Sequence, residues 1–266
     1  VARMARRVIG VGEDAYASTM GGNVCATVEA PKGSIGSIHA IGGSIGLPQY
    51  DVPCVIAAHG AIRNVIAVAK EGDYEALGGY IFSDIIAGGA VGVVKAVGGD
   101  ISGSDDPEEL ATAPVLIKGA SLRRLMARGK VFRYFDDAEY YGGNIGANAV
   151  VSGAITLVSA KGGDMSVSLA SHGEIDSVTV KSKTYKLYRD EPREKSGGAI
   201  FSSTILPNVL YRSTVPGDYR GVLRKLNVAG SVRDTWIGTR GPTTARQFKF
   251  GALTNSEIWV DGRRMY

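Results

Sequence analysis

The chain has 266 residues, and its 37 Gly are about twice the number expected from an average usage of roughly 7%. The glycines follow no strict third-residue period, which excludes a collagen triple helix, and a hydrophobic share of 44% excludes disorder along the whole chain. The net charge is only +4, from 30 basic and 26 acidic residues spread along the chain, so we expect no nucleic-acid partner.

The N-terminal segment, residues 1–20, precedes the first repeat and carries the basic residues Arg3, Arg6 and Arg7. We expect it to be a cap or an extension, with its basic run exposed to solvent. No apolar stretch of the chain reaches the ~18 residues that a membrane-spanning helix needs, so we expect no membrane insertion.

From residue 21 onwards one pattern recurs: Gly, a small residue, an aliphatic, two variable positions, an aliphatic, one variable position, Ala or Val, and one or two Gly. The closest copies are residues 33–45 (GSIGSIHAIGGSI), 89–101 (GAVGVVKAVGGDI) and 153–165 (GAITLVSAKGGDM). Looser copies begin at Gly60, Ala120, Gly173, Gly221 and Gly251. Short β-branched runs precede many of these copies, which predicts a unit of strand, glycine turn, strand and glycine turn.

The spacing of the copies favours a stacked all-β fold. Counted from Gly119, the residue before the copy at Ala120, the starts at 33, 60, 89, 119 and 153 are 27, 29, 30 and 34 residues apart, and the next start, 173, follows after 20. A coil of ~20 residues holds three short strands and three tight turns, so longer spacings indicate loops inserted at the turns. We predict a right-handed, single-stranded parallel β-helix (a β-solenoid) with irregular loop insertions over residues 21–242, and a final coil or C-terminal cap over residues 243–266.

The three closest copies resemble the glycine-rich repeats of secreted and cell-surface bacterial proteins of the pectate-lyase-like β-helix class, and the resemblance covers roughly residues 20–262. That class includes surface adhesins, passenger domains, phage tailspikes, polysaccharide lyases and glycoside hydrolases. The resemblance implies the right-handed β-helix fold and a secreted or cell-surface location. It carries over no catalytic signature residue by residue.

The insert at residues 130–143 is rich in aromatic and acidic residues. Aromatic rings stack on sugar faces, and paired carboxylates can protonate a glycosidic oxygen or activate water. The insert therefore offers three candidate catalytic acids and four candidate saccharide-binding residues: Asp136, Asp137 and Glu139 for the first set, and Arg133, Tyr134, Tyr140 and Tyr141 for the second. Adjacent residues point to opposite faces of a strand, which weakens the pairing of Asp136 with Asp137. The alternative is a loop whose aromatics cover the coil below and whose acids face water.

Two other acidic or charged stretches are candidates for chemistry. Calcium takes six to eight oxygen ligands, so the acidic run offers Asp105 and Asp106 as candidate ligands, together with Asp100, Glu108 and Glu109. The spacing matches neither an EF-hand nor a calcium nonapeptide, so a solvated turn is the alternative, and we expect no other cofactor. In the insert at residues 181–198, Lys186 or Arg189 could serve as the base of a lyase.

The histidines and cysteines give weaker signals. His39, His59 and His172 each stand beside a repeat element, and we expect turn or surface positions for them. Cys25 and Cys54 could be brought close by neighbouring coils, but their offset of two residues relative to the repeat glycines weighs against a disulfide.

These observations favour a structural or adhesive protein that contacts a polysaccharide or another surface polymer, or that self-associates through its open coil ends. Two alternatives stay open. One is a polysaccharide lyase or glycoside hydrolase with its site on the 130–143 loop, and the other is a phage tailspike or fibre.

Overall fold

The computed structural model describes residues 8–11, 23–24, 27–46, 54–72, 76–103, 110–112, 114–133, 138–188, 192–207, 221–240, 248–261 and 263–265. These residues form strands and turns and no helix. The strands make two large parallel sheets and three small antiparallel hairpins. The prediction of an all-β chain with parallel strands is therefore confirmed.

Sheet A is nine-stranded, and its strands lie side by side in chain order. They are β1 (Val8–Val11), β3 (Ile35–Ile41), β5 (Ile62–Val68), β9 (Val91–Val97), β11 (Leu122–Arg128), β15 (Ile155–Lys161), β17 (Ile175–Lys181), β22 (Leu223–Val228) and β25 (Phe248–Lys249).

Sheet B is 13-stranded and faces sheet A. Its main path is β2 (Val28–Ala30), β4 (Val55–Ala58), β8 (Asp84–Ala87), β10 (Val115–Gly119), β14 (Ile145–Val151), β16 (Met165–Ser171), β21 (Thr204–Pro207), β24 (Trp236–Thr239), β27 (Glu257–Val260) and β28 (Arg263–Arg264). Three short strands lie beside this path: β20 (Ile200–Phe201), β23 (Ser231–Arg233) and β26 (Ala252–Thr254). All of these pairings are parallel except that of β27 with β28.

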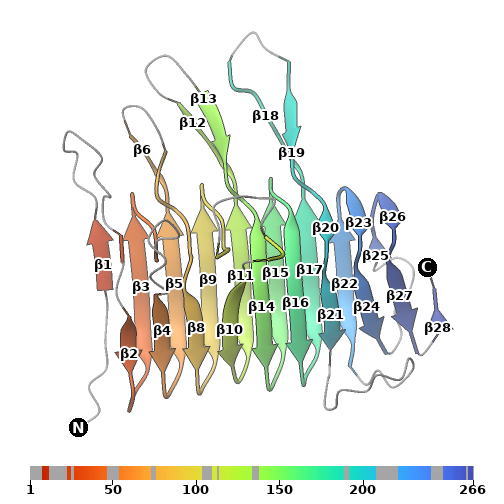
Figure 1. Cartoon of the computed structure of the whole chain (residues 1–266), viewed down its shortest axis with the longest axis horizontal. Helices are drawn as coiled ribbons and strands as arrows, with labels where there is room; N and C mark the ends of the chain where they lie inside the picture. Colours follow the sequence, from red (N-terminus) through yellow and green to blue (C-terminus); the bar gives the residue numbers. More distant parts are fainter. Residues whose placement is uncertain are drawn as a thin grey trace.

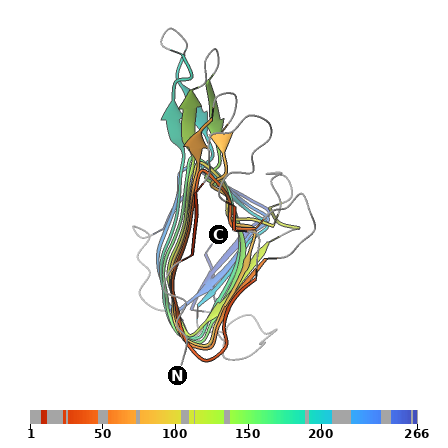
Figure 2. The same cartoon turned by 90° about the vertical axis from the view of Figure 1, so that its left-hand side faces the viewer.

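The chain alternates between the two sheets, and we call one pass through sheet B and then sheet A a coil. Thus β4 leads into β5 and β8 leads into β9, and each strand pairs with its counterpart in the next coil. Figure 1 shows the coils stacked along the long axis, with the two termini at opposite ends. Seen along that axis, the two sheets meet at the lower edge, and hairpins project from the upper edge (Figure 2).

Aliphatic side chains from the repeat fill the space between the sheets. The first, fourth and sixth residues of β3, which are Ile35, Ile38 and Ala40, are buried and pair with Ile62, Val65 and Ala67 of β5. The same columns continue through the following coils of sheet A. Each fully buried Ile or Leu contributes roughly 1.5–3 kcal/mol relative to an exposed one. The repeated positions therefore provide the main stabilisation of the stack.

The second and third residues of each repeat strand both lie outside the core. In β11, Leu122 and Leu125 are buried, whereas the intervening Arg123 and Arg124 are both exposed. Strict alternation along a strand would have placed one of these arginines inside. Each coil therefore presents two neighbouring side chains on the outer face of sheet A at this position.

Three hairpins project from the upper edge and form a crest (Figure 1): β6 (Lys70–Glu71) with β7 (Ala76–Leu77), β12 (Lys130–Arg133) with β13 (Ala138–Tyr141), and β18 (Lys183–Tyr185) with β19 (Glu194–Ser196). They follow β5, β11 and β17, which are alternate strands of sheet A. The intervening strands β3, β9 and β15 run into Gly-Gly turns instead. The closest sequence copies, at 33, 89 and 153, are thus the coils without a hairpin.

The first glycine of these turns has a positive φ, and Gly98 and Gly162 both lie under the β12–β13 hairpin. Gly98 has a φ of 71°, and a Cβ there would lie 2.5 Å from Cζ of Phe132. Gly162 has a φ of 78°, and a Cβ there would collide with Oη of Tyr140. Glycine is required at both positions by the backbone conformation and by the overlying ring.

Candidate functional site

The crest contains the described members of the aromatic and acidic insert. Arg133 is exposed at the end of β12, and Glu139, Tyr140 and Tyr141 belong to β13. The Tyr141 hydroxyl donates a hydrogen bond to the Glu139 carboxylate. Tyr134, Asp136 and Asp137 lie outside the described residues. The structure therefore brings Glu139 and Tyr141 together on one side of the hairpin.

Tyr140 connects two hairpins of the crest. Its ring stacks on that of Tyr185 in β18, with 4.4 Å between centroids and 16° between planes. Its hydroxyl lies over Gly129 and Gly162 and meets no hydrogen-bond partner among the described residues. Burial raises the pKa of Tyr140 far above its ordinary value, and burial followed by Glu194 raises that of Tyr185 to about 12. Tyr140 therefore covers the stack beneath it, as expected if the aromatic residues of the 130–143 insert cover the coil below.

Phe132 anchors the base of the same hairpin. It is fully buried over Gly98, and its ring meets that of Tyr141 edge-on at 6.0 Å. The Lys130 Nζ lies 4.5 Å from the ring centroid, a cation–π distance. The hairpin is therefore fixed to the stack at its base by packing.

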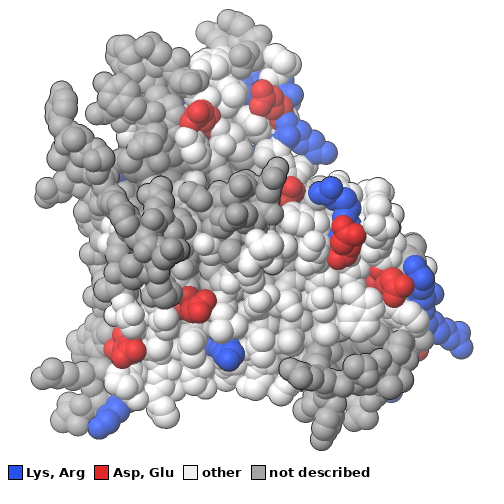
Figure 3. All heavy atoms as spheres, viewed as in Figure 1, with Lys and Arg blue, Asp and Glu red and all other residues white. Residues whose placement is uncertain are grey.

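The outer face of sheet A is rich in cations. Residues that alternate with the buried positions of its strands include Arg63, Lys95, Arg123, Arg124, Arg128, Lys161, Lys181, Arg224, Lys225 and Lys249. In Figure 3, where sheet B lies in front, charged groups are few over the described part of that sheet apart from its C-terminal end. Among the described residues the excess of positive charge thus lies on the outer face of sheet A.

The cations of sheet A are stacked directly on one another beside the crest. Arg128 pairs in register with Lys161, and Lys161 pairs with Lys181. All three are exposed, and within the described part of the chain none forms an ion pair. Like charges directly opposite each other on neighbouring strands are destabilising. We call this set of three residues the cation column.

Two lysines of the crest lie close to the cation column. The Lys183 Nζ donates a hydrogen bond to the carbonyl oxygen of Gly129 at 3.0 Å and lies 5.1 Å from the ring centroid of Tyr140. Burial lowers the pKa of Lys183, and the positive charges of Arg128, Lys161 and Lys130 lower it further. The base of the crest is therefore a region of concentrated positive charge.

The described carboxylates of sheet A lie at the far end of this face. Arg224 forms ion pairs with Glu174 and with Asp176, the latter at 3.3 Å between Nε and Oδ1. Both partners are exposed, so the pairs contribute little to stability. They do, however, neutralise Arg224, whereas no ion pair neutralises the cation column within the described residues.

Asp100, a candidate calcium ligand, belongs instead to a ladder of polar side chains inside the stack. Its Oδ1 accepts from the backbone N–H of Asn144 at 2.7 Å, and its Oδ2 accepts from Nδ2 of Asn144 at 3.1 Å. The Asn144 Oδ1 in turn accepts from the N–H of Asp164 at 2.7 Å. Burial raises the pKa of Asp100 from 3.8 to about 6, although these hydrogen bonds oppose the shift.

The other sequence candidates are dispersed. Asp105, Asp106, Glu108, Glu109, Arg189 and Cys25 lie outside the described residues, and among the described ones no group of three or more metal-binding side chains occurs. Lys186 is exposed next to β18, His39 lies on the outer face of sheet A, and His59 and His172 occupy turns at the lower edge. Cys54 is buried, with Sγ 3.7 Å from the carbonyl oxygen of Val24.

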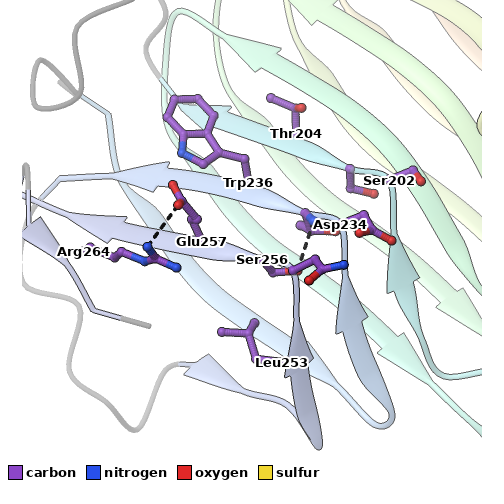
Figure 4. A pocket seen from close by; sticks show the side chains of 11 residues that line it. Ser202, Thr204, Asp234, Trp236, Leu253, Ser256, Glu257 and Arg264 are labelled. Atoms are coloured by element: carbon purple, nitrogen blue, oxygen red, sulfur yellow. Dashed lines mark hydrogen bonds and ion pairs between the residues drawn. The ribbon is translucent and has the colours of Figure 1, made fainter.

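Sequence reasoning missed a hollow of about 930 Å³ at the C-terminal end of sheet B. Figure 4 shows Trp236 at one side of it, Glu257 and Arg264 below, and Asp234 on the neighbouring bend. Its lining includes Ser202, Asn255 and Leu253 from adjacent coils. A signal was available, since FSSTI, RDTWI and TNSEI share a short polar residue followed by Ser or Thr and, two residues later, by Ile.

Among the described residues no helix is long and apolar enough to span a membrane. No family model matches the chain, and neither the curated proteins nor the solved structures include a match to it.

Proposed function

We propose that this chain is a right-handed parallel β-helix with a structural or adhesive role at the cell surface or outside the cell, and that sheet A contacts an acidic polysaccharide. The alternation of the chain between two parallel sheets supports the fold, because about 98% of crossovers between parallel strands of one sheet are right-handed. An experimental structure with left-handed coils would contradict it. The resemblance of the glycine-rich repeats to secreted and surface proteins supports the location.

The cation column is the observation that carries the proposed contact. Arg128, Lys161 and Lys181 repeat with the coil spacing of ~4.8 Å. That spacing is comparable to the length of one sugar ring in an extended glycan. A chain of acidic sugars along the stack can therefore place one carboxylate near each cation, which removes the repulsion between neighbouring cations. Lys130 and Lys183 extend the positive region toward the crest.

Binding to immobilised polygalacturonate, with dextran as the neutral polymer, tests this contact. We expect the protein to bind polygalacturonate and not dextran. This binding should weaken as the salt concentration rises, because salt screens exposed charges. Lys161→Glu should weaken binding about tenfold or more, since it reverses the central charge of the column. The matched control is Lys118→Glu, which makes the same charge change on the outer face of sheet B.

Equal losses for the two variants would show that net charge alone is responsible, and would contradict a site on sheet A. Equal affinity for polygalacturonate and for single-stranded DNA would show that sheet A binds polyanions in general and would contradict a specific contact with polysaccharide. Failure to bind any acidic polymer would reject the proposed contact.

A further inference from the structure

We propose a second binding site, for a neutral saccharide, in the hollow at the C-terminal end of sheet B, with Trp236 as the stacking surface and Asp234 and Asn255 as hydrogen-bonding groups. This site lies on the sheet opposite the cation column. It does not depend on the function proposed above.

The hollow arises from a bend that three successive coils share. Ser202, Asp234 and Asn255 have φ values of 45°, 48° and 47°, and each separates a short strand from the following strand of sheet B. Left-handed backbone is unfavourable for residues other than Gly, by roughly 1–2 kcal/mol each, and Asn and Asp tolerate it best. Residues held in such strained conformations cluster at binding and active sites.

The floor of the hollow is rigid because its hydroxyl groups bond to the backbone. Ser203, Thr235 and Ser256 are buried, and each donates a 2.8 Å hydrogen bond to the carbonyl oxygen two residues before it. Ser256 Oγ also accepts from the N–H of Thr235 at 3.0 Å. These hydroxyls fix the bend, and ligand binding is left to the side chains above them.

The walls combine an aromatic ring with a neutralised acid. Trp236 is half-buried and lies in register between Thr204 and Glu257 on the outer face of sheet B. Glu257 Oε1 pairs with Nη1 of Arg264 at 3.2 Å, and Oε2 accepts from Nε1 of Trp259 at 2.9 Å. Figure 4 shows this pair on the side of the hollow away from Asp234.

The chemistry of the lining selects a saccharide among possible ligands. Its volume is in the range of roughly 300–1,000 Å³ that small-molecule sites occupy, but Ser, Thr, Asp and Asn predominate over apolar side chains, which disfavours a hydrophobic ligand. Glu257 is already paired with Arg264, and the exposed carboxylate of Asp234 disfavours an anion. An indole ring beside carboxylate and amide groups suits a sugar, whose C–H face stacks on the ring while its hydroxyls bond to oxygen and nitrogen. Exposed Asp234 and Asn255 stand one coil apart, about one sugar ring.

Tryptophan fluorescence gives a direct test, because the chain has only two Trp. In a Trp259→Phe protein the emission comes from Trp236 alone. We would titrate this protein with neutral hexasaccharides of β-1,4-linked glucose, mannose and xylose and with a hexamer of galacturonate. At least one neutral oligomer should shift the emission and protect the ring from acrylamide quenching.

Calorimetry on the otherwise unaltered chain then assigns the contacts. Trp236→Ala should weaken binding of that oligomer about tenfold or more, and Trp236→Phe should restore part of it. Asn255→Gly removes the amide while keeping a residue that adopts positive φ freely, so it should weaken binding with little change in thermal stability. Binding unaffected by Trp236→Ala, or shown by the galacturonate oligomer alone, would overturn the proposal, as would no binding by any oligomer.

Discussion

Asp100 is a buried carboxyl group whose surroundings favour its neutral form. The neighbouring coil supplies hydrogen bonds from Asn144, which stabilise the carboxylate, yet burial outweighs them and the pKa rises to about 6. In the unfolded chain the same group titrates near 3.8. The folded state therefore binds the proton more tightly than the unfolded state does. Asp100 thus forms part of the polar ladder inside the stack, and its ionisation near neutral pH lowers the stability of the folded state.

This shift predicts a pH dependence of stability. The contribution of a raised carboxyl pKa is fully present below pH 3.8 and is lost as the pH rises through about 6. Urea unfolding of the wild type and of Asp100→Asn should therefore show a difference in unfolding free energy that falls by roughly 2 kcal/mol between pH 4 and pH 7. A difference that stays constant over this range would contradict the assigned burial of a titrating Asp100.

At the scale of elements, the crest hairpins are held to one another by side-chain contacts. Tyr140 stacks on Tyr185, and the Tyr188 hydroxyl accepts a hydrogen bond from the N–H of Ala138 at 3.0 Å. The hairpins also cover the positive-φ glycines of the coils without hairpins, as Phe132 covers Gly98. The inserts are therefore part of the packing of the stack.

A double-mutant cycle measures this link between hairpins. Tyr140→Ala and Tyr185→Ala should each lower the free energy of unfolding. The loss in the double mutant should be smaller than the sum of the two single losses by roughly 0.5–1.5 kcal/mol, the value of a stacked aromatic pair. Tyr141→Ala is the matched control, because its ring meets Phe132 and not Tyr185. The cycle of Tyr141 with Tyr185 should be additive within about 0.5 kcal/mol. Additivity in both cycles would mean that the hairpins are independent.

The repeat spacing predicted stacked coils of short parallel strands, and the aliphatic residues at fixed positions of the repeat form the core columns of that stack. Arg123 and Arg124 both lie outside because the strand has a doubled outward position, which departs from strict strand alternation. The cation column was hidden, because Arg128, Lys161 and Lys181 are far apart in sequence and meet only through the register of stacked coils. The candidate acids of the 130–143 insert were chosen from local composition, which cannot show which hairpin faces which neighbour.

At the scale of the whole molecule, the repeating unit is a pair of coils, one with a hairpin and one with a Gly-Gly turn. The β12–β13 hairpin lies over Gly98 of the coil before it and over Gly162 of the coil after it, so neighbouring coils are complementary rather than equivalent. The energetics of such a stack follow from the coils and from the interfaces between neighbours. Removing a whole pair of coils therefore leaves every coil with a hairpin next to a coil with a Gly-Gly turn. Removing a single coil places two coils of the same kind next to each other.

Two deletions test the pairwise unit. Deleting residues 89–152 joins Gly88 to Gly153 and recreates the Ala-Gly-Gly-Ala turn found at 87–90. Deleting residues 89–119 removes less of the chain but also removes Gly98, over which Phe132 is buried. We expect the longer deletion to fold with the higher melting temperature in circular dichroism. A higher melting temperature for the shorter deletion would contradict the paired arrangement.

The stacking of coils between termini at opposite ends has a mechanical consequence. The strands run across the long axis, so a pull on the two ends loads the hydrogen bonds of one terminal coil at a time, and the stack peels open in steps. A load applied along the strands is shared as shear by every coil. Anchored through its ends, the molecule yields at low force and lengthens gradually. A polymer bound along the cation column would instead spread its load over the three coils that it contacts.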